Sequence, residues 1–108
     1  MKIAILQSNG FPGEKQRNLE YIEKYASHAA QQGADMLITA ELFISGYHLD
    51  ARTFHTLSEP VHGASILQLQ NIAQKYAIAI VTGWPERDGE AMYNSAVLID
   101  KNAKVLLH

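Results

Sequence analysis

The stretch GADMLITAELFISGY, residues 33–47, decides how the rest of the chain is interpreted. Gly33 is typical of a helix end, and the apolar run Met36–Ile38 has no helical period, which predicts a short buried strand over residues 35–39. Glu41 follows that strand directly and precedes an apolar triplet. Because ligands bind at the carboxyl ends of strands in open α/β sheets, Glu41 is the first candidate for a functional side chain.

Elsewhere, the spacing of apolar and turn-forming residues predicts two helices, four more strands and a long loop. The helices have apolar residues at three- and four-residue steps along one face and span Glu14–Gln32 and Ala64–Tyr76. The strands are expected at residues 2–7, 77–83, 93–100 and 104–107, the loop at 50–63 with a helical turn near 51–57, and a polar turn at 86–90. Gly83 and Pro85 are expected to end the third strand of the chain.

This order of elements predicts an α/β fold with a mixed sheet. Strands that are apolar on both faces, including a buried first strand, alternate with helices, which is typical of a sheet covered by helices. The last two strands are expected to form a hairpin. Five strands and two helices leave one sheet face and one edge poorly covered, and His108 follows an apolar run directly. We therefore expect residues 1–108 to be part of a larger domain.

The composition is that of an ordinary globular protein and argues against several functions. Apolar residues make up 47% and charged residues 19% of the 108 residues, and the net charge is −2. The basic residues are scattered, and no segment has the length of a signal peptide or a membrane span. We expect a cytoplasmic protein that binds neither nucleic acid nor membrane. The absence of cysteine excludes disulfides, thiolate metal sites and a cysteine nucleophile among these residues.

Four residues have both a structural and a functional interpretation. A glutamate after a strand is most often a surface or helix-start residue, but the apolar surroundings of Glu41 favour a partly shielded carboxyl with a raised pKa, suited to proton transfer. Asn94, at the start of the fourth strand, is either a buried amide or a residue that fixes a neighbouring carboxylate. Tyr47, like Trp84, either borders a pocket or belongs to the core.

The remaining polar residues give no strong site. Three histidines recur every seven residues, namely His48, His55 and His62. Pro60 and Gly63 break any helix that would align them, and the spacing is not that of a zinc site. We therefore expect no metal. No serine has a Gly-x-Ser-x-Gly context and no glycine-rich loop follows the first strand, so we expect neither a serine nucleophile nor a cofactor. Four acids are most simply turn and cap residues, namely Asp35, Asp50, Glu59 and Asp100.

Several blocks, in the same order and spacing, resemble the N-terminal part of the nitrilase superfamily, the carbon–nitrogen hydrolases. They are KIAILQ at residues 2–7, Asn18-Leu19, GADMLITAELFISGY at 33–47, Glu59-Pro60 through Gly63, IVTG at 80–83 with Glu86-Arg87, and YNSAVLID at 93–100. Two positions depart from the family pattern. Ala40 replaces the usual proline before the glutamate, and Ala103 replaces a usual turn glycine.

The resemblance implies the αββα sandwich of carbon–nitrogen hydrolases and a Glu-Lys-Cys triad with Glu41 as general base. In such a triad the cysteine attacks an amide or nitrile carbon, the lysine stabilises the oxyanion and the glutamate transfers protons. The family's lysine would lie just past His108 and its cysteine further on, and neither Lys101 nor Lys104 is assigned that role. The resemblance therefore implies a homo-oligomeric hydrolase of small amides or nitriles, while residues 1–108 alone are expected to be inactive.

Two other hypotheses stay open at this point. One is a binding or assembly module without catalysis that self-associates through its open sheet edge. The other is a flavodoxin-like nucleotide or regulatory domain, against which the missing glycine-rich loop and the terminal hairpin both argue.

Overall fold

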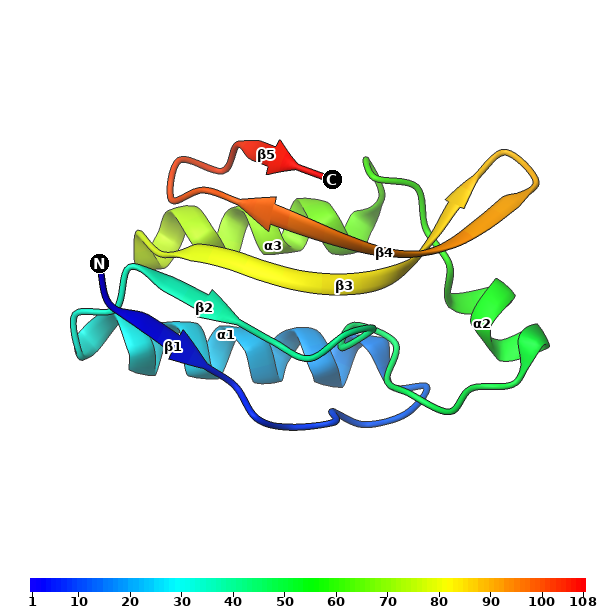
Figure 1. Ribbon diagram of the computed structural model, residues 1–108, viewed down its shortest axis with the longest axis horizontal. Helices are drawn as coiled ribbons and strands as arrows, with labels where there is room; N and C mark the ends of the chain where they lie inside the picture. Colours follow the sequence, from blue (N-terminus) through cyan, green and yellow to red (C-terminus); the bar gives the residue numbers. More distant parts are fainter.

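The computed structural model describes residues 1–108 as a five-stranded sheet with two long helices against one face (Figure 1). The strands lie side by side in chain order as β1 (Ile3–Ile5), β2 (Met36–Ile38), β3 (Ala79–Asp88), β4 (Ala91–Ile99) and β5 (Val105–Leu107). The first three are parallel, and β4 and β5 each run antiparallel to the preceding strand. The predicted α/β fold with a mixed sheet is confirmed.

The helices also agree with the sequence pattern. The two long helices are α1 (Lys15–Gln31) and α3 (Ala64–Tyr76), and the short helix α2 (Ala51–Leu57) lies beside the far half of β3. Gly33, just after α1, has a φ of +82°, a conformation that glycine adopts without strain and that ends the helix. None of the three helices combines the length and the apolar character that crossing a bilayer requires.

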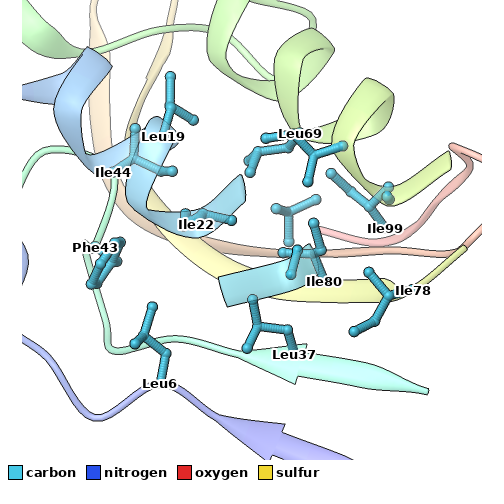
Figure 2. Close-up of a cluster of buried hydrophobic side chains, with 14 of the residues drawn as sticks. Leu6, Leu19, Ile22, Leu37, Phe43, Ile44, Leu69, Ile78, Ile80 and Ile99 are labelled. Carbon is cyan, nitrogen blue, oxygen red and sulfur yellow. The ribbon is translucent and has the colours of Figure 1, made fainter. Parts of the chain in front are cut away.

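The core lies between the helices and the sheet (Figure 2). Leu37, Ile80 and Ile99 are register partners on β2, β3 and β4, so their side chains leave the sheet on the same face. There they join Ile22 of α1 and Leu69 of α3 in one buried cluster. Burying one such side chain contributes about 1.5–3 kcal/mol, which makes this layer the main source of stability.

The opposite face of the sheet carries no helix. Ile3 and Ile5 of β1 are 49% and 67% exposed, and Leu107 of β5 is 67% exposed. The prediction of a buried first strand is therefore wrong for this chain, because alternate side chains of β1 leave the sheet on the uncovered face. The expectation that one face would be poorly covered is confirmed.

β3 is longer than predicted. It continues through Pro85 to Asp88, and the turn before β4 is Gly89-Glu90 instead of the expected residues 86–90. The carbonyl of Pro85 accepts a hydrogen bond from the amide of Glu59 (3.0 Å) and therefore faces away from β4. Because the nitrogen of a strand residue lies on the same side as its carbonyl, the proline removes no hydrogen bond from the β3–β4 ladder.

Candidate active site

The Glu41 turn, residues 41–45, follows β2 and lies against β3. Hydrogen bonds fix the chain on both sides of Glu41, since the amide of Thr39 donates to the carbonyl of Val81 (3.0 Å) and the amide of Ile44 donates to that of Gly83 (3.1 Å). Glu41 is thereby held beyond the carboxyl end of β2, the place where parallel sheets bind ligands.

Gly83 lets this turn approach the sheet closely. A Cβ atom at Gly83 would lie 2.8 Å from the amide nitrogen of Leu42 and 3.0 Å from the carbonyl oxygen of Ser95. Leu42 itself has a φ of +52°, in the left-handed region that costs a leucine about 1–3 kcal/mol. The turn that begins with Glu41 is therefore a strained segment pressed against β3, and strain of this kind is concentrated at functional sites.

The carboxylate of Glu41 accepts hydrogen bonds from two neutral side chains. The hydroxyl of Tyr47 donates to Oε2, and Nδ2 of Asn94, on β4, donates to Oε1. The Tyr47 bond lowers the pKa of Glu41 most, the Asn94 bond lowers it further, and partial desolvation opposes both. The same bond raises the pKa of the Tyr47 hydroxyl. Glu41 is thus negatively charged at neutral pH.

This environment differs from the one that the sequence favoured. The sequence indicated a shielded carboxyl with a raised pKa, whereas Glu41 is exposed in this chain and its pKa is lowered. The apolar residues that follow it do not surround it, because Phe43 and Ile44 turn into the core beneath the sheet. Glu41 instead meets donors from Tyr47 and Asn94, which stabilise the ionised form.

Glu41 lines a hollow of about 300 Å³ that lies beyond the carboxyl end of β2 and along β3 and β4. Asn94, Thr39 and Thr82 also line it, and the hydroxyls of Thr39 and Thr82 are hydrogen-bonded to each other at 2.6 Å. Val81 is shared with a second, mostly apolar hollow of about 290 Å³ on the uncovered face. The arrangement offers one charged acceptor and several neutral hydrogen-bonding groups beside apolar surface.

Asn18 of α1 holds the Glu41 turn in place by hydrogen bonds, a role that was not predicted from the sequence. Its side chain is fully buried in α1, and its Nδ2 donates to the carbonyls of Phe11 and Ile44, both at 3.0 Å. Its Oδ1 accepts from the amide of Phe11 at 2.6 Å. Asn18 therefore joins α1, the loop after β1 and the Glu41 turn. The signal in the sequence is an asparagine on the apolar side of a helix, which requires buried partners.

The other candidates lie elsewhere in the fold. Asp50 caps α2 by accepting from the amide of Thr53 (2.7 Å), and Asp100 accepts from two amides of its own turn, so both predicted roles are confirmed. Trp84 is fully buried and belongs to the core. No group of three or more histidine, aspartate or glutamate side chains is arranged to hold a metal ion.

Glu59, predicted as a turn or cap residue, does accept a hydrogen bond from an amide at the start of α3, but it is also part of a larger buried network. It is 9% exposed, and its carboxylate forms an ion pair with Lys15 and accepts hydrogen bonds from Ser65. Burial raises its pKa, but these contacts outweigh burial, and the pKa of Glu59 is lowered overall. This network could not be predicted from the sequence, because its members lie in three separate segments.

Comparison with known proteins identifies the family of this chain. The carbon-nitrogen hydrolase family matches residues 2–107. The chain is 33% identical over 101 residues to a nitrilase of Pyrococcus abyssi, covering 92% of this chain and 38% of that protein. It is 29% identical over 109 residues to a citrullinase of Francisella tularensis, covering 98% of this chain and 38% of that protein.

A solved structure is similar over nearly the whole chain. An amidase from Nesterenkonia sp. superposes with a TM-score of 0.88 at 34% identity, covering 99% of this chain and 41% of that one. A double mutant of the same amidase, in complex with acrylamide, superposes equally well at 33% identity. The present chain therefore spans about 40% of the length of the relatives it matches.

Fold and site together define an α/β protein that presents an ionised acid beyond the end of a parallel strand. The family match over residues 2–107 makes the assignment specific, and the chain belongs to the carbon–nitrogen hydrolase family. The resemblance found in the sequence is confirmed, and the fold is that of an amidase of the nitrilase superfamily.

Proposed function

We propose that this chain forms the glutamate-bearing part of a carbon–nitrogen hydrolase that cleaves a small amide or nitrile, with Glu41 as general base. The observation that carries the proposal is the carboxylate of Glu41, held by Tyr47 and Asn94 over a hollow at the end of β2. A general base must be ionised and accessible. The lowered pKa of Glu41 provides the first condition and its exposure the second.

Tyr47 and Asn94 are proposed to orient the base. They donate to different oxygens of the carboxylate, so together they oppose its rotation about the Cγ–Cδ bond. A carboxylate has about four lone-pair positions, and two hydrogen bonds leave the others free for a proton. Orientation of this kind is what a base needs in order to meet its nucleophile in a reactive geometry.

In the proposed reaction, Glu41 takes the thiol proton of a cysteine whose sulfur attacks the amide or nitrile carbon. A lysine stabilises the negative charge of the intermediate, ammonia or an amine leaves, and water activated by Glu41 hydrolyses the thioester. The chain contains no cysteine. Lys101 borders a different hollow, beside Asp35 and Ala79 at the start of β2 and β3. We propose that the lysine and the cysteine come from chain beyond residues 1–108.

The relatives support the substrate class. The Nesterenkonia amidase has been captured with acrylamide and with butyramide, two small amides. In one of its structures acrylamide is added at the active-site cysteine. Other relatives are nitrilases. A small amide or nitrile is therefore the proposed substrate of the whole enzyme. We further propose that the enzyme uses no cofactor and is a cytoplasmic homo-oligomer.

The test is ammonia release from butyramide and from a small nitrile. We expect activity from the chain expressed with the coding sequence that follows His108, and none from residues 1–108 alone. Glu41→Gln in the longer protein should lower kcat/KM about 10²–10⁴-fold. Glu20→Gln, the same change at an exposed acid of α1, should leave it unaltered. Full activity of Glu41→Gln, or turnover by residues 1–108, would contradict the proposal.

The uncovered sheet face favours a second candidate, an assembly module without catalysis. Ile3, Ile5 and Leu107 are exposed on the outermost strands of the sheet. Two such faces could stack as in a β-sandwich and remove apolar surface from water. Residues 1–108 should then self-associate in sedimentation experiments, and Ile5→Lys should shift the population toward monomer. A chain that stays monomeric at every concentration would count against this candidate.

A further inference from the structure

Glu59 connects the helical layer with the strand that faces Asn94. We propose that Glu59 is a positioning residue that holds Asn94 in place on the carboxylate of Glu41. Glu59 touches neither Glu41 nor the hollow beside it, and its effect passes through the β3–β4 hairpin. The inference rests on the proposed function for its catalytic consequence, whereas the geometric link can be tested without any turnover.

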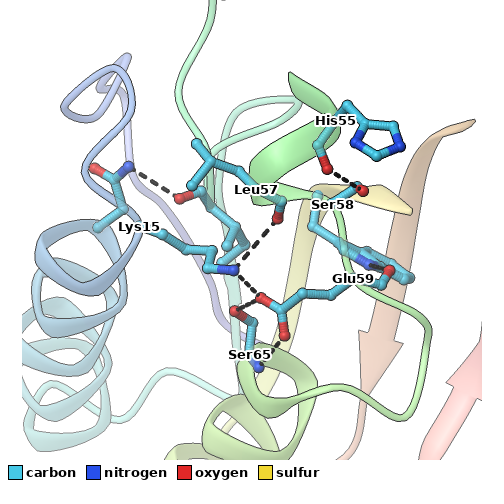
Figure 3. A network of polar contacts seen from close by, with 9 residues as sticks. Lys15, His55, Leu57, Ser58, Glu59 and Ser65 are labelled. Atoms are coloured by element: carbon cyan, nitrogen blue, oxygen red, sulfur yellow. Dashed lines mark hydrogen bonds and ion pairs between the residues drawn. The ribbon is translucent and has the colours of Figure 1, made fainter. Parts of the chain in front are cut away.

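The carboxylate of Glu59 fixes the residue to the helices (Figure 3). Nζ of Lys15, in the first turn of α1, lies 2.5 Å from Oε2. At the start of α3, the amide of Ser65 donates to Oε1 at 2.9 Å and its hydroxyl donates to Oε2. Nζ of Lys15 also donates to the carbonyl of Leu57, at the end of α2. Because these contacts come from both long helices and are charge-assisted, Glu59 cannot shift without breaking several of them.

The backbone of Glu59 fixes β3 at the same time. Its amide donates to the carbonyl of Pro85 (3.0 Å), and its own carbonyl accepts from the amide of Arg87 (2.9 Å) and from Nε1 of Trp84 (2.9 Å). Residue 59 thereby acts as a single extra strand residue beside β3. β2 pairs with β3 only as far as Val81, and beyond Gly83 this edge of β3 has its backbone hydrogen bonds with Glu59.

This part of β3 is the part that positions Asn94. Pro85 and Asn94 are register partners in the β3–β4 hairpin, whose far end extends beyond β1 and β2 (Figure 1). Tyr47, by contrast, belongs to the segment of Glu41 itself. A shift of the far half of the hairpin should therefore break the Asn94 bond and leave the Tyr47 bond intact. This selectivity distinguishes positioning from a general loss of stability.

The experiment is an NMR titration of the 108-residue chain that follows the Glu41 carboxyl and the Asn94 side-chain amide. In Glu59→Gln we expect the pKa of Glu41 to rise, in the direction that loss of the Asn94 bond requires. The Asn94 amide signals should shift as well. The matched control is Glu23→Gln, which also removes an ion pair, to Lys75 at 3.3 Å, but on the helical layer. Neither signal should move in that variant.

Two outcomes would overturn the inference. One is a folded Glu59→Gln chain in which the Glu41 pKa and the Asn94 signals are those of the unsubstituted protein. The other is an equal shift in Glu59→Gln and Glu23→Gln, which would indicate a general effect. If Glu59→Gln does not fold, Lys15→Gln is measured in the same way, because it keeps the Ser65 contacts. A smaller shift is expected there, and none in a folded chain would reject the proposal.

Discussion

Glu41 and Glu59 are two carboxylates with lowered pKa values that are held in opposite ways. Glu59 is buried, and the contacts of Lys15 and Ser65 outweigh the effect of burial. Glu41 is exposed, and its pKa is lowered by neutral donors, Tyr47 more than Asn94. One carboxylate is therefore paired with a cation inside the fold, and the other is an oriented charge at its surface.

The difference separates a carboxylate that stabilises the fold from one that is available for chemistry. The charge of Glu59 is neutralised by Lys15, and its oxygens are occupied by that ammonium and by two donors of Ser65. A proton acceptor needs access, which the buried Glu59 lacks, and three of its about four lone-pair positions are already occupied. Glu41 borders a hollow and has one donor on each oxygen. A lowered pKa alone would not have distinguished them.

The largest expected effect is on stability. Glu59→Ala leaves Lys15 without its partner and the first turn of α3 without its acceptor, so the free energy of unfolding should fall by about 3 kcal/mol. Glu41→Ala should change it far less, because the side chain is exposed. Urea unfolding of both variants measures the difference. Equal losses of stability in the two variants would mean that Glu59 does not stabilise the fold more than Glu41 does.

A smaller loss of stability is expected from Gly83→Ala, a substitution that disturbs the Glu41 turn and not the Glu59 network. The added methyl group would meet the backbone of Leu42, and overpacking of this kind costs about 1–3 kcal/mol. Hydrogen exchange should accelerate at Ile44, whose amide bonds to residue 83, and stay unchanged at Arg87, whose amide bonds to Glu59. Unchanged stability, or faster exchange at Arg87 alone, would contradict this description of the Glu41 turn.

The acid dependence of stability should come more from Glu59 than from Glu41. Both carboxylates have folded pKa values below the ordinary 4.5, so each stabilises the fold above that pH and loses its contribution as the pH falls through its folded pKa. Solvent screens the exposed Glu41. Glu59→Gln should therefore flatten the pH dependence below about pH 5 more than Glu41→Gln does. Urea unfolding at several pH values measures this, and the reverse order would refute it.

The parts of the fold with a local signal could be predicted from the sequence. The bounds of α3 agree with the prediction and those of α1 differ by one residue at each end, because the apolar periodicity lies within each helix and Gly33 closely follows α1. The end of β3 could not be predicted, because Pro85 is tolerated in the strand only when its nitrogen faces away from the β3–β4 ladder, and the pairing of distant segments decides that. The exposure of Ile3 and Ile5 likewise depends on what covers the sheet and not on β1 itself.

The candidate site was predictable in position but not in charge state. Glu41 was found from its place after an apolar strand and from the family resemblance. Its lowered pKa depends on Tyr47, six residues along the chain, and on Asn94, 53 residues along. Tyr47 and Asn94 could be suggested as supports from the sequence, but only the pairing of β3 with β4 brings Asn94 to the carboxylate. The buried support from Asn18 needed the structure for the same reason.

The smallest expected effect is on the pKa of Glu41, and it compares the contributions of its two hydrogen-bond donors. Tyr47→Phe and Asn94→Ala should each raise the pKa of Glu41 toward 4.5, and Tyr47→Phe should raise it more, because the tyrosine bond is the larger cause of the lowering. Neither change should lower the free energy of unfolding appreciably, since Glu41 is exposed. NMR titration of the carboxyl carbon measures both shifts against Tyr93→Phe, an exposed tyrosine next to Asn94. A larger shift in Asn94→Ala would mean that the hairpin, and with it Glu59, controls the charge of Glu41 more than the turn that carries it.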